Sequence, residues 1–258
     1  MKYLSLLKYG FKRVFAYKWS VILGFFVSII AMYIMRMFWK AIYFNNSAQW
    51  EYMCNYVIWA EVLSISYTMR GATKLCNNIR DGSITVEFIR PRNYVLSLLF
   101  EDIGTMLGKV VSVGIPLLCF AAVIWGFRIG NCKRLVYFVI DILLSYIILF
   151  LFKIIIAFFS FWFIEAKALQ IMADIIIKFF SGEFLPGWIM PDSLRKIIYK
   201  LPFVWIFEKP ISFILQNDFT MKNYLCLILN QLSWIIVLVA IAYLLWRSAQ
   251  KKLIIQGG

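Results

Sequence analysis

The chain has 258 residues, of which 63% are hydrophobic and only 16% are charged, and its mean hydropathy is +0.80. A soluble protein of this size needs a more polar surface, so the composition excludes a soluble globular protein and predicts an integral membrane protein in contact with the lipid bilayer. The net charge of +14 does not indicate nucleic acid as a partner, because the basic residues stand in short groups between apolar runs, as in membrane proteins.

The first 18 residues carry five basic side chains and precede an apolar run at residues 19–39. This arrangement is superficially similar to a secretory signal peptide. The run is too long for the apolar region of a signal peptide, and no small-residue cleavage site follows it. The sequence therefore predicts a cytoplasmic segment over residues 1–18 and a first transmembrane helix over residues 19–39.

Six apolar stretches meet or approach the length of about 20 residues that a helix needs to cross the hydrocarbon layer. After residues 19–39, they are residues 53–69, 106–127, 135–164, 171–185 and 224–246. The predicted fold class is therefore an all-α integral membrane protein with six transmembrane helices. We expect one transmembrane domain over residues 1–258.

Lysine and arginine favour the cytoplasmic side of a membrane, and the chain concentrates them in three segments. These are residues 1–18, residues 70–93 and the tail at residues 247–258, whereas the segment FNNSAQWEYM has none. Both termini and residues 70–93 are therefore predicted to be cytoplasmic. Five basic residues then fall on the outer side, against the rule: Arg36, Lys40, Arg128, Lys133 and Arg134.

Several ionisable residues lie inside the apolar stretches, where a charge is costly and therefore indicates a function or a partner. Asp174 and Lys178 are spaced to form an ion pair on one helix. Glu61 has no partner in its own stretch and should face the protein interior or an aqueous cavity. Either a substrate or a polar group of another helix could contact it. Glu61, Lys153 and Asp174 are the candidates for a translocation path or for buried polar contacts.

The motif GTMLGKV lacks the spacing of a phosphate-binding loop and ends in Val instead of Ser or Thr. Its small residues at four-residue spacing, Gly104, Gly108 and Ser112, predict close packing against another helix. No cofactor or metal site is expected, because the chain has no histidine and its five cysteines show no CxxC pair. Cys54 and Cys132 could pair near the outer face or remain free thiols.

The segment at residues 182–220 contains the breaks and the apolar runs of an unusual connection. Gly182, Pro186, Gly187 and Pro191 end the fifth apolar stretch. Asp192 or Ser193 is expected to cap a short helix lying in the membrane interface. This helix would present one apolar face, formed by Leu194, Ile197, Ile198 and Leu201. The following runs FVWIF and ISFIL predict a re-entrant outer hairpin, with an amphipathic surface loop as the alternative.

The polar segment at residues 70–93 separates the second and third apolar stretches. A short helix is predicted to end at Gly82, which suits the first position after a helix. A second short element should stop at Pro91, which pushes Arg90 out of helical geometry. The result would be a bent, charged projection on the cytoplasmic side; the alternative is a plain solvated loop.

Three stretches together resemble one family. IRDGSITVEFIRPRNYVLSLL is similar to the signature of type-2 ABC transporter permeases, in which a Gly and a hydrophobic position precede LLRP and a further apolar residue. The tail LWRSAQKKLIIQGG and the segment SGEFLPGWIMPDSLRKIIYKLPFVWIFEKPISFIL resemble the corresponding parts of the small six-helix export branch. The resemblance covers essentially the whole chain.

The resemblance implies one permease half of an ATP-driven exporter in a bacterial-type plasma membrane. Two ABC ATPase subunits would dock beneath a dimer with a second, identical or related permease, and ATP and Mg²⁺ would be bound by those partners. Residues 70–93 would hold the coupling helix. The family positions fall on Arg80, Asp81, Gly82, Glu87, Arg90 and Pro91. One departure is the β-branched run ITV after Ser83, where many relatives carry better helix formers.

Two functions of other classes stay open from the sequence. A membrane-embedded enzyme acting on lipid or peptide would need a convergent catalytic set, and the lone carboxylates form none. A stand-alone channel or ion-coupled carrier is the other alternative, and a carrier should show inverted repeats, which are not evident. The aromatic-rich helices suit an amphipathic drug, a peptide or a lipid-like substrate.

Overall fold

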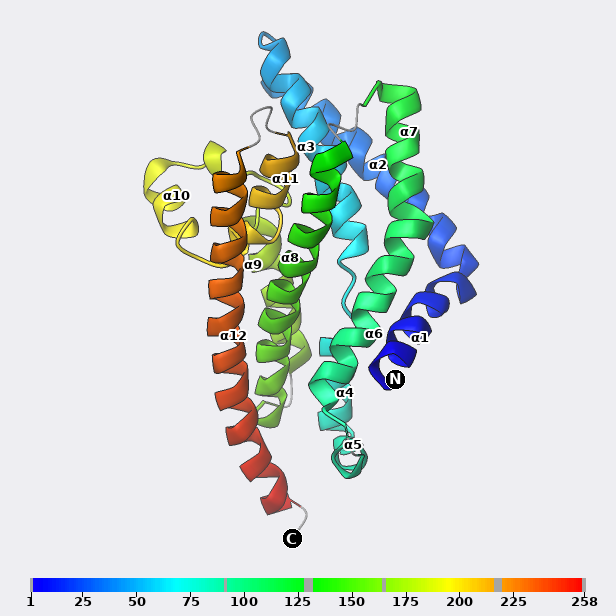
Figure 1. Cartoon of the computed structure of the whole chain (residues 1–258), viewed down its shortest axis with the longest axis vertical. Coiled ribbons are helices and arrows are strands. Elements are labelled where there is room, and N and C mark those ends of the chain that lie inside the picture. Colours follow the sequence, from blue (N-terminus) through cyan, green and yellow to red (C-terminus); the bar gives the residue numbers. More distant parts are fainter. Residues whose placement is uncertain (1, 91, 128–131, 164–165, 216–219, 257–258) are drawn as a thin grey trace.

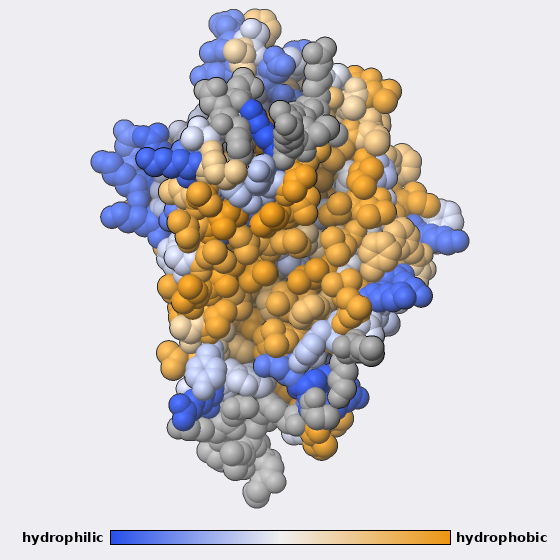
Figure 2. All heavy atoms as spheres, viewed as in Figure 1, coloured by the Kyte–Doolittle hydropathy of each residue, from blue (hydrophilic) through white to orange (hydrophobic). Residues whose placement is uncertain are grey.

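A computed structural model of the chain describes residues 2–90, 92–127, 132–163, 166–215 and 220–256 (Figure 1). All regular secondary structure in these ranges is helical, and the long helices run roughly along one axis. A broad hydrophobic band covers the middle of the molecule, and hydrophilic residues gather at both of its ends (Figure 2). This distribution is that of a protein embedded in a bilayer, as the composition predicts.

In the described residues, four helical stretches are long and apolar enough to cross a membrane. They are α2 (Lys18–Ile42), the continuous stretch α6–η1–α7 (Tyr94–Lys109, Val110–Gly114 and Ile115–Trp125), α8 (Cys132–Phe158) and α12 (Met221–Gln256). These stretches include four of the predicted spans, although their boundaries differ by several residues.

The other two predicted spans form helices of a different kind. α3 (Ser47–Ser66) is a largely buried helix of 20 residues, with ten residues in the protein interior, so it tolerates the polar side chains that lower its hydropathy. α9 (Ala166–Phe180) has 15 residues and is about 22 Å long, shorter than the hydrocarbon layer of about 30 Å. Membrane crossing by α3 and α9 therefore stays a prediction.

The N-terminal segment forms a helix that the charge pattern did not predict, α1 (Lys2–Ala16), which packs along α6. A Cβ atom at Gly10 would lie 2.1 Å from the carbonyl oxygen of Glu101, and one at Gly104 would lie 2.0 Å from that of Leu7. At Gly108 it would lie 2.9 Å from Val14. The prediction of close packing at Gly104 and Gly108 is confirmed, and the partner helix is α1.

The long α6–α7 stretch changes its winding in the middle. η1 is a π-helical turn immediately before Pro116, which stands in the first turn of α7. Because proline has no N–H and its ring collides with the preceding turn, the helix widens at this place.

Short helices occupy the two ends of the bundle, which are named as they stand in Figure 1. The lower end carries α4 (Gly71–Arg80), α5 (Ile84–Ile89) and η2 (Phe159–Phe161). Towards the upper end lie η3 (Gly187–Ile189), α10 (Asp192–Ile198), η4 (Phe203–Trp205) and α11 (Glu208–Leu215).

The predicted short helix at residues 192–201 exists as α10, with two corrections. The residue before the helix is Pro191 and no side chain caps it, because Asp192 stands in the first turn and pairs with Arg195 instead. Ile198 is buried against Met190 and Val204, whereas Ile197 is 60% exposed, so the four apolar residues do not form one buried face.

Candidate functional site

The segment at residues 70–90 forms a bent projection at the lower end of the bundle (Figure 1). α4 ends at Arg80, Asp81 follows as its cap, and Gly82 adopts the left-handed conformation with φ = +71°. Arg90 has the extended backbone that a following proline imposes (φ −74°, ψ 130°). Both predicted helix ends are therefore confirmed, while Pro91 itself lies outside the described residues.

Apolar contacts hold this projection against the bundle. Leu75 and Cys76 of α4 and Ile84 of α5 share a buried cluster with Ile154 and Phe158 of α8. Leu75 and Ile154 are fully buried, so the projection is a packed part of the bundle and not a plain solvated loop. The β-branched run at residues 84–86 does not prevent a helix, because Ile84 is fixed by this packing.

Two consecutive carboxylates of α6 fasten the start of α4. The carboxylate of Asp102 accepts hydrogen bonds from the backbone N–H groups of Gly71 (2.8 Å) and Arg70 (3.3 Å), which satisfies the first turn of α4. The neighbouring Glu101 accepts from Arg13 of α1 (2.5 Å) and Lys74 of α4 (2.9 Å). Helices α1, α4 and α6 therefore meet at one acidic pair, which we call the anchor.

Sequence reasoning missed the anchor. The sequence indicates it only by two adjacent carboxylates, Glu101 and Asp102, just before the apolar stretch at residues 106–127. The partners of Glu101 stand 88 and 27 residues away in the sequence, so no local spacing pointed to them.

The predicted coupling residues divide into two groups. Glu87 is largely buried and accepts from Arg90 (2.8 Å) and Arg92 (2.9 Å), so it braces the end of α5 internally. Arg80 and Asp81 form a weak, exposed pair at 3.4 Å beside Gly82.

The tip of α5 exposes apolar side chains that the sequence reasoning did not select. Val86 is 53% exposed and Ile89 is 82% exposed, and Arg90 lies beside them. We call Val86, Ile89 and Arg90 the tip.

The candidate path residues do not form one site. Glu61 accepts a hydrogen bond from Ser28. Together with Glu183 it lines a cavity of about 260 Å³ beside α2 and α3, which agrees with one of the two surroundings expected for it from the sequence. Asp174 pairs with Lys153 across α8 and α9. The predicted Asp174–Lys178 pair is wrong: the packing of α9 on α8 places Lys153 beside Asp174, and Lys178 instead approaches Glu183 at 3.9 Å.

Asp141, an acid of the apolar stretch that forms α8, is fully buried between α8 and α12. Its side chain accepts a hydrogen bond from Gln231, whose amide nitrogen also lies 2.9 Å from Ser145 Oγ and 3.3 Å from the carbonyl oxygen of Trp205. Gln231 of α12 therefore joins this helix to α8 and to η4.

The connection after α9 is organised by Glu208, which the sequence reasoning did not select. This side chain is 1% exposed and accepts from the backbone N–H of Gly187 (2.6 Å) and the hydroxyl of Tyr199 (2.5 Å). Burial, together with the hydrogen bond to Glu208, raises the pKa of Tyr199 above its usual range. Gly182 has φ = +88°, and its carbonyl accepts from Tyr56 (2.6 Å).

The cysteines carry no site in the part of the chain that is described. Cys54 is a buried free thiol, and the side chain of Cys132 lies outside the described part. The described residues contain no group of three or more His, Cys, Asp or Glu side chains that could hold a metal ion.

Comparison with protein families identifies a match over most of the chain. Residues 43–257 match the model of a protein family described as ABC-2 family transporter protein. This range covers most of the chain, including α3, the projection and the connection around Glu208. Among curated proteins, none matches the chain.

Proposed function

The chain belongs to the ABC-2 family of transporter proteins, and from this we propose that it is the membrane permease subunit of an ATP-driven exporter. ATP and Mg²⁺ would be bound by a separate ABC ATPase, present in two copies beneath a dimer of this chain with itself or a related permease. The lower end of the bundle would face the cytoplasm of a bacterial-type cell, with both termini on that side. The observation that carries the proposal is the packed projection with its exposed tip.

The tip has the composition of a docking surface. Ile89 and Val86 present apolar area at the furthest point of the projection, and Arg80 and Arg90 place positive charge beside it. An apolar centre with a charged rim is the usual arrangement of a protein interface. Glu87 does not need a partner on the ATPase, because its arginines are already supplied by this chain.

The anchor would transmit the movement of the ATPase into the membrane. A displacement of α4 acts on Asp102 through the N–H groups of Arg70 and Gly71, and on Glu101 through Lys74. Both carboxylates belong to α6, which continues through η1 into α7. α4, α6 and α1 would therefore move as one body, and the π-helical turn is the place where α7 could bend relative to it.

The exported substrate would be an amphipathic drug, a peptide or a lipid-like molecule, consistent with the apolar and aromatic helices. Glu61 is the best placed of the candidate path residues, because it lines a cavity. Lys153 and Asp174 neutralise each other in the monomer.

Reconstitution tests this function. The chain is co-expressed with an ABC ATPase from the same genome and reconstituted in liposomes, and a fluorescent amphipathic dye and MgATP are added outside, so that outward-facing ATPases drive the dye into the lumen. We expect dye transport that requires MgATP and is lost when the ATPase lysine that binds the ATP phosphates is replaced. Transport by the chain alone, driven by an ion gradient, would contradict the proposal and favour a carrier.

A further inference from the structure

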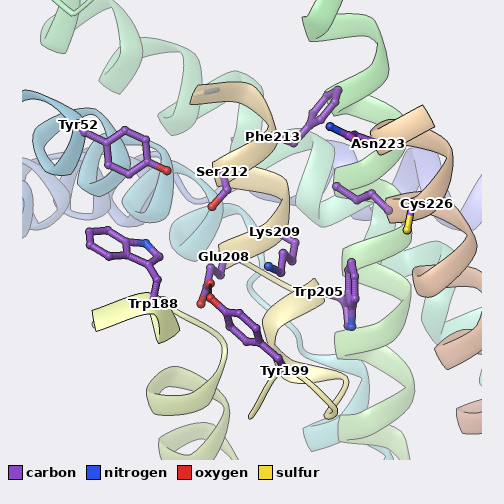
Figure 3. A pocket seen from close by; sticks show the side chains of 11 residues that line it. Tyr52, Trp188, Tyr199, Trp205, Glu208, Lys209, Ser212, Phe213, Asn223 and Cys226 are labelled. Carbon is purple, nitrogen blue, oxygen red and sulfur yellow. Dashed lines mark hydrogen bonds between the residues drawn. The ribbon is translucent and has the colours of Figure 1, made fainter. Parts of the chain in front are cut away.

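A pocket of about 630 Å³ opens near the upper end of the bundle, between the start of α3, the connection from η3 to α11, and the start of α12 (Figure 3). Five aromatic side chains form much of its wall: Tyr52, Trp188, Tyr199, Trp205 and Phe213. Pockets that take ligands of drug size have volumes of about 300–1,000 Å³ and mostly apolar walls with a few polar groups. The volume and the wall both fit that description.

One cation lies among these rings. The amine of Lys209 is 4.2 Å from the ring centroid of Tyr199, and in the described part of the chain it forms no ion pair. Glu208 also lines the pocket, but its two oxygens already accept from Gly187 and Tyr199. The carboxylate is therefore a fixed part of the wall, and Lys209 is the cation of the described wall that an anionic ligand would contact.

The pocket also offers a hydrogen-bonding amide. The indole Nε1 of Trp205 has no acceptor among the described residues, but it is buried, so Trp205 contributes ring surface to the wall and not a donor to a ligand. Asn223 adds an exposed amide at the start of α12, while Ser212 is hydrogen-bonded to Tyr52.

We propose that this pocket binds the anionic head group, a phosphate or a carboxylate, of an amphipathic molecule. Lys209 supplies the opposite charge, Asn223 offers an exposed amide donor, and the aromatic rings contact the apolar part of the ligand. Beside the pocket, α12 exposes the apolar side chains of Leu225 and Leu229, where an amphipathic ligand would be concentrated. Figure 2 shows the hydrophobic band across the middle of the molecule. The inference goes beyond the transport function, because binding requires neither the ATPase nor that the ligand be the exported cargo.

A binding experiment on the full chain in phosphatidylcholine nanodiscs tests the proposal. Tryptophan fluorescence is followed during titration with lysophosphatidic acid, with the monoacylglycerol of the same chain length, with an alkyltrimethylammonium ion, and with inorganic phosphate. We expect lysophosphatidic acid to bind at least about tenfold more tightly than either of the other amphiphiles, because only it satisfies Lys209. Equal binding of the cationic amphiphile, or binding of inorganic phosphate as tight as that of the lipid, would overturn the proposal.

Variants locate the binding. Lys209→Met keeps the apolar stem and should weaken lysophosphatidic acid about tenfold or more, with a change below about twofold for the monoacylglycerol. Lys209→Arg should restore binding. Lys196→Met, at an exposed lysine outside the pocket, is the matched control. Asn223→Ala removes the amide donor of the wall and gives a second test if Lys209→Met fails to fold. Parent-like binding by both pocket variants would contradict the assignment.

Discussion

At the scale of single residues, the connection after α9 depends on a very close approach of chain segments. Gly182 has φ = +88°, and a Cβ atom there would lie 2.8 Å from both the hydroxyl of Tyr56 and the Cβ of Glu208. Gly126 also has a positive φ, +65°, but nothing lies within 4 Å of the position of its Cβ. A side chain at Gly126 would therefore meet only backbone strain, whereas a side chain at Gly182 would meet backbone strain and a steric clash.

Replacing each of these glycines by alanine should give unequal losses of stability. Gly126→Ala carries only the cost of the left-handed backbone, about 1–2 kcal/mol. Gly182→Ala carries that cost and also displaces Tyr56 or Glu208, so its melting temperature should fall clearly further. The measurement is thermal unfolding in detergent, in a background where Cys119, Cys132 and Cys226 are replaced by Ser, followed with a thiol-reactive dye that detects exposure of the buried Cys54 and Cys76. Equal melting temperatures of the two variants would show that Tyr56 and Glu208 leave room for a side chain at Gly182.

At the scale of elements, the bend between α4 and α5 was predictable because its signals are local. Gly82 after a helix and Pro91 after Arg90 each restrict the backbone of the nearest residues. The anchor was not predictable in this way, because Glu101 meets Arg13 and Lys74 only after three helices have packed together. The same limit explains the wrong Asp174–Lys178 pair, since sequence spacing identifies a possible partner and tertiary packing selects another.

The anchor should affect coupling more than assembly. Glu101→Gln removes the charge that joins α1 and α4 to α6 while keeping an acceptor, so we expect the protein to fold with a loss of about 1–3 kcal/mol. The ATPase should bind as it does to the parent, but the amount of substrate moved per ATP hydrolysed should fall severalfold. Both quantities are measured in the same liposomes. Glu51→Gln, at an exposed acid of α3, is the control. Unchanged coupling in Glu101→Gln would leave the anchor with a purely structural role.

At the scale of the whole molecule, hydropathy predicted the class of the protein and four of its long helices. It did not reveal α1 as a helix packed along α6, because the basic residues at the N-terminus read as a topological signal. It also gave no view of how buried α3 is, since an apolar segment can face lipid or protein. The orientation in the membrane stays a prediction from the distribution of lysine and arginine.

Thiol labelling tests that orientation. Ser47 at the upper end and Ser83 in the projection are both exposed. In a background where Cys119, Cys132 and Cys226 are replaced by Ser, cysteine at Ser47 should react with an impermeant reagent added to intact cells. Cysteine at Ser83 should react only after the cells are opened. The reverse pattern would place the projection outside and remove it from the reach of a cytoplasmic ATPase.

The central claim is that the tip at the lower end of the bundle docks an ABC ATPase, and its affinity for that ATPase tests the claim most directly. Ile89→Asp places a charge at the most exposed apolar residue of the tip, and Ile197→Asp does the same at the upper end, where the parent residue is 60% exposed. With both variants in detergent, titration with the ATPase subunit should show at least about tenfold weaker binding for Ile89→Asp, because a buried unpaired charge is costly at an interface. Ile197→Asp should bind like the parent. Parent-like binding by Ile89→Asp would contradict the docking role of the tip.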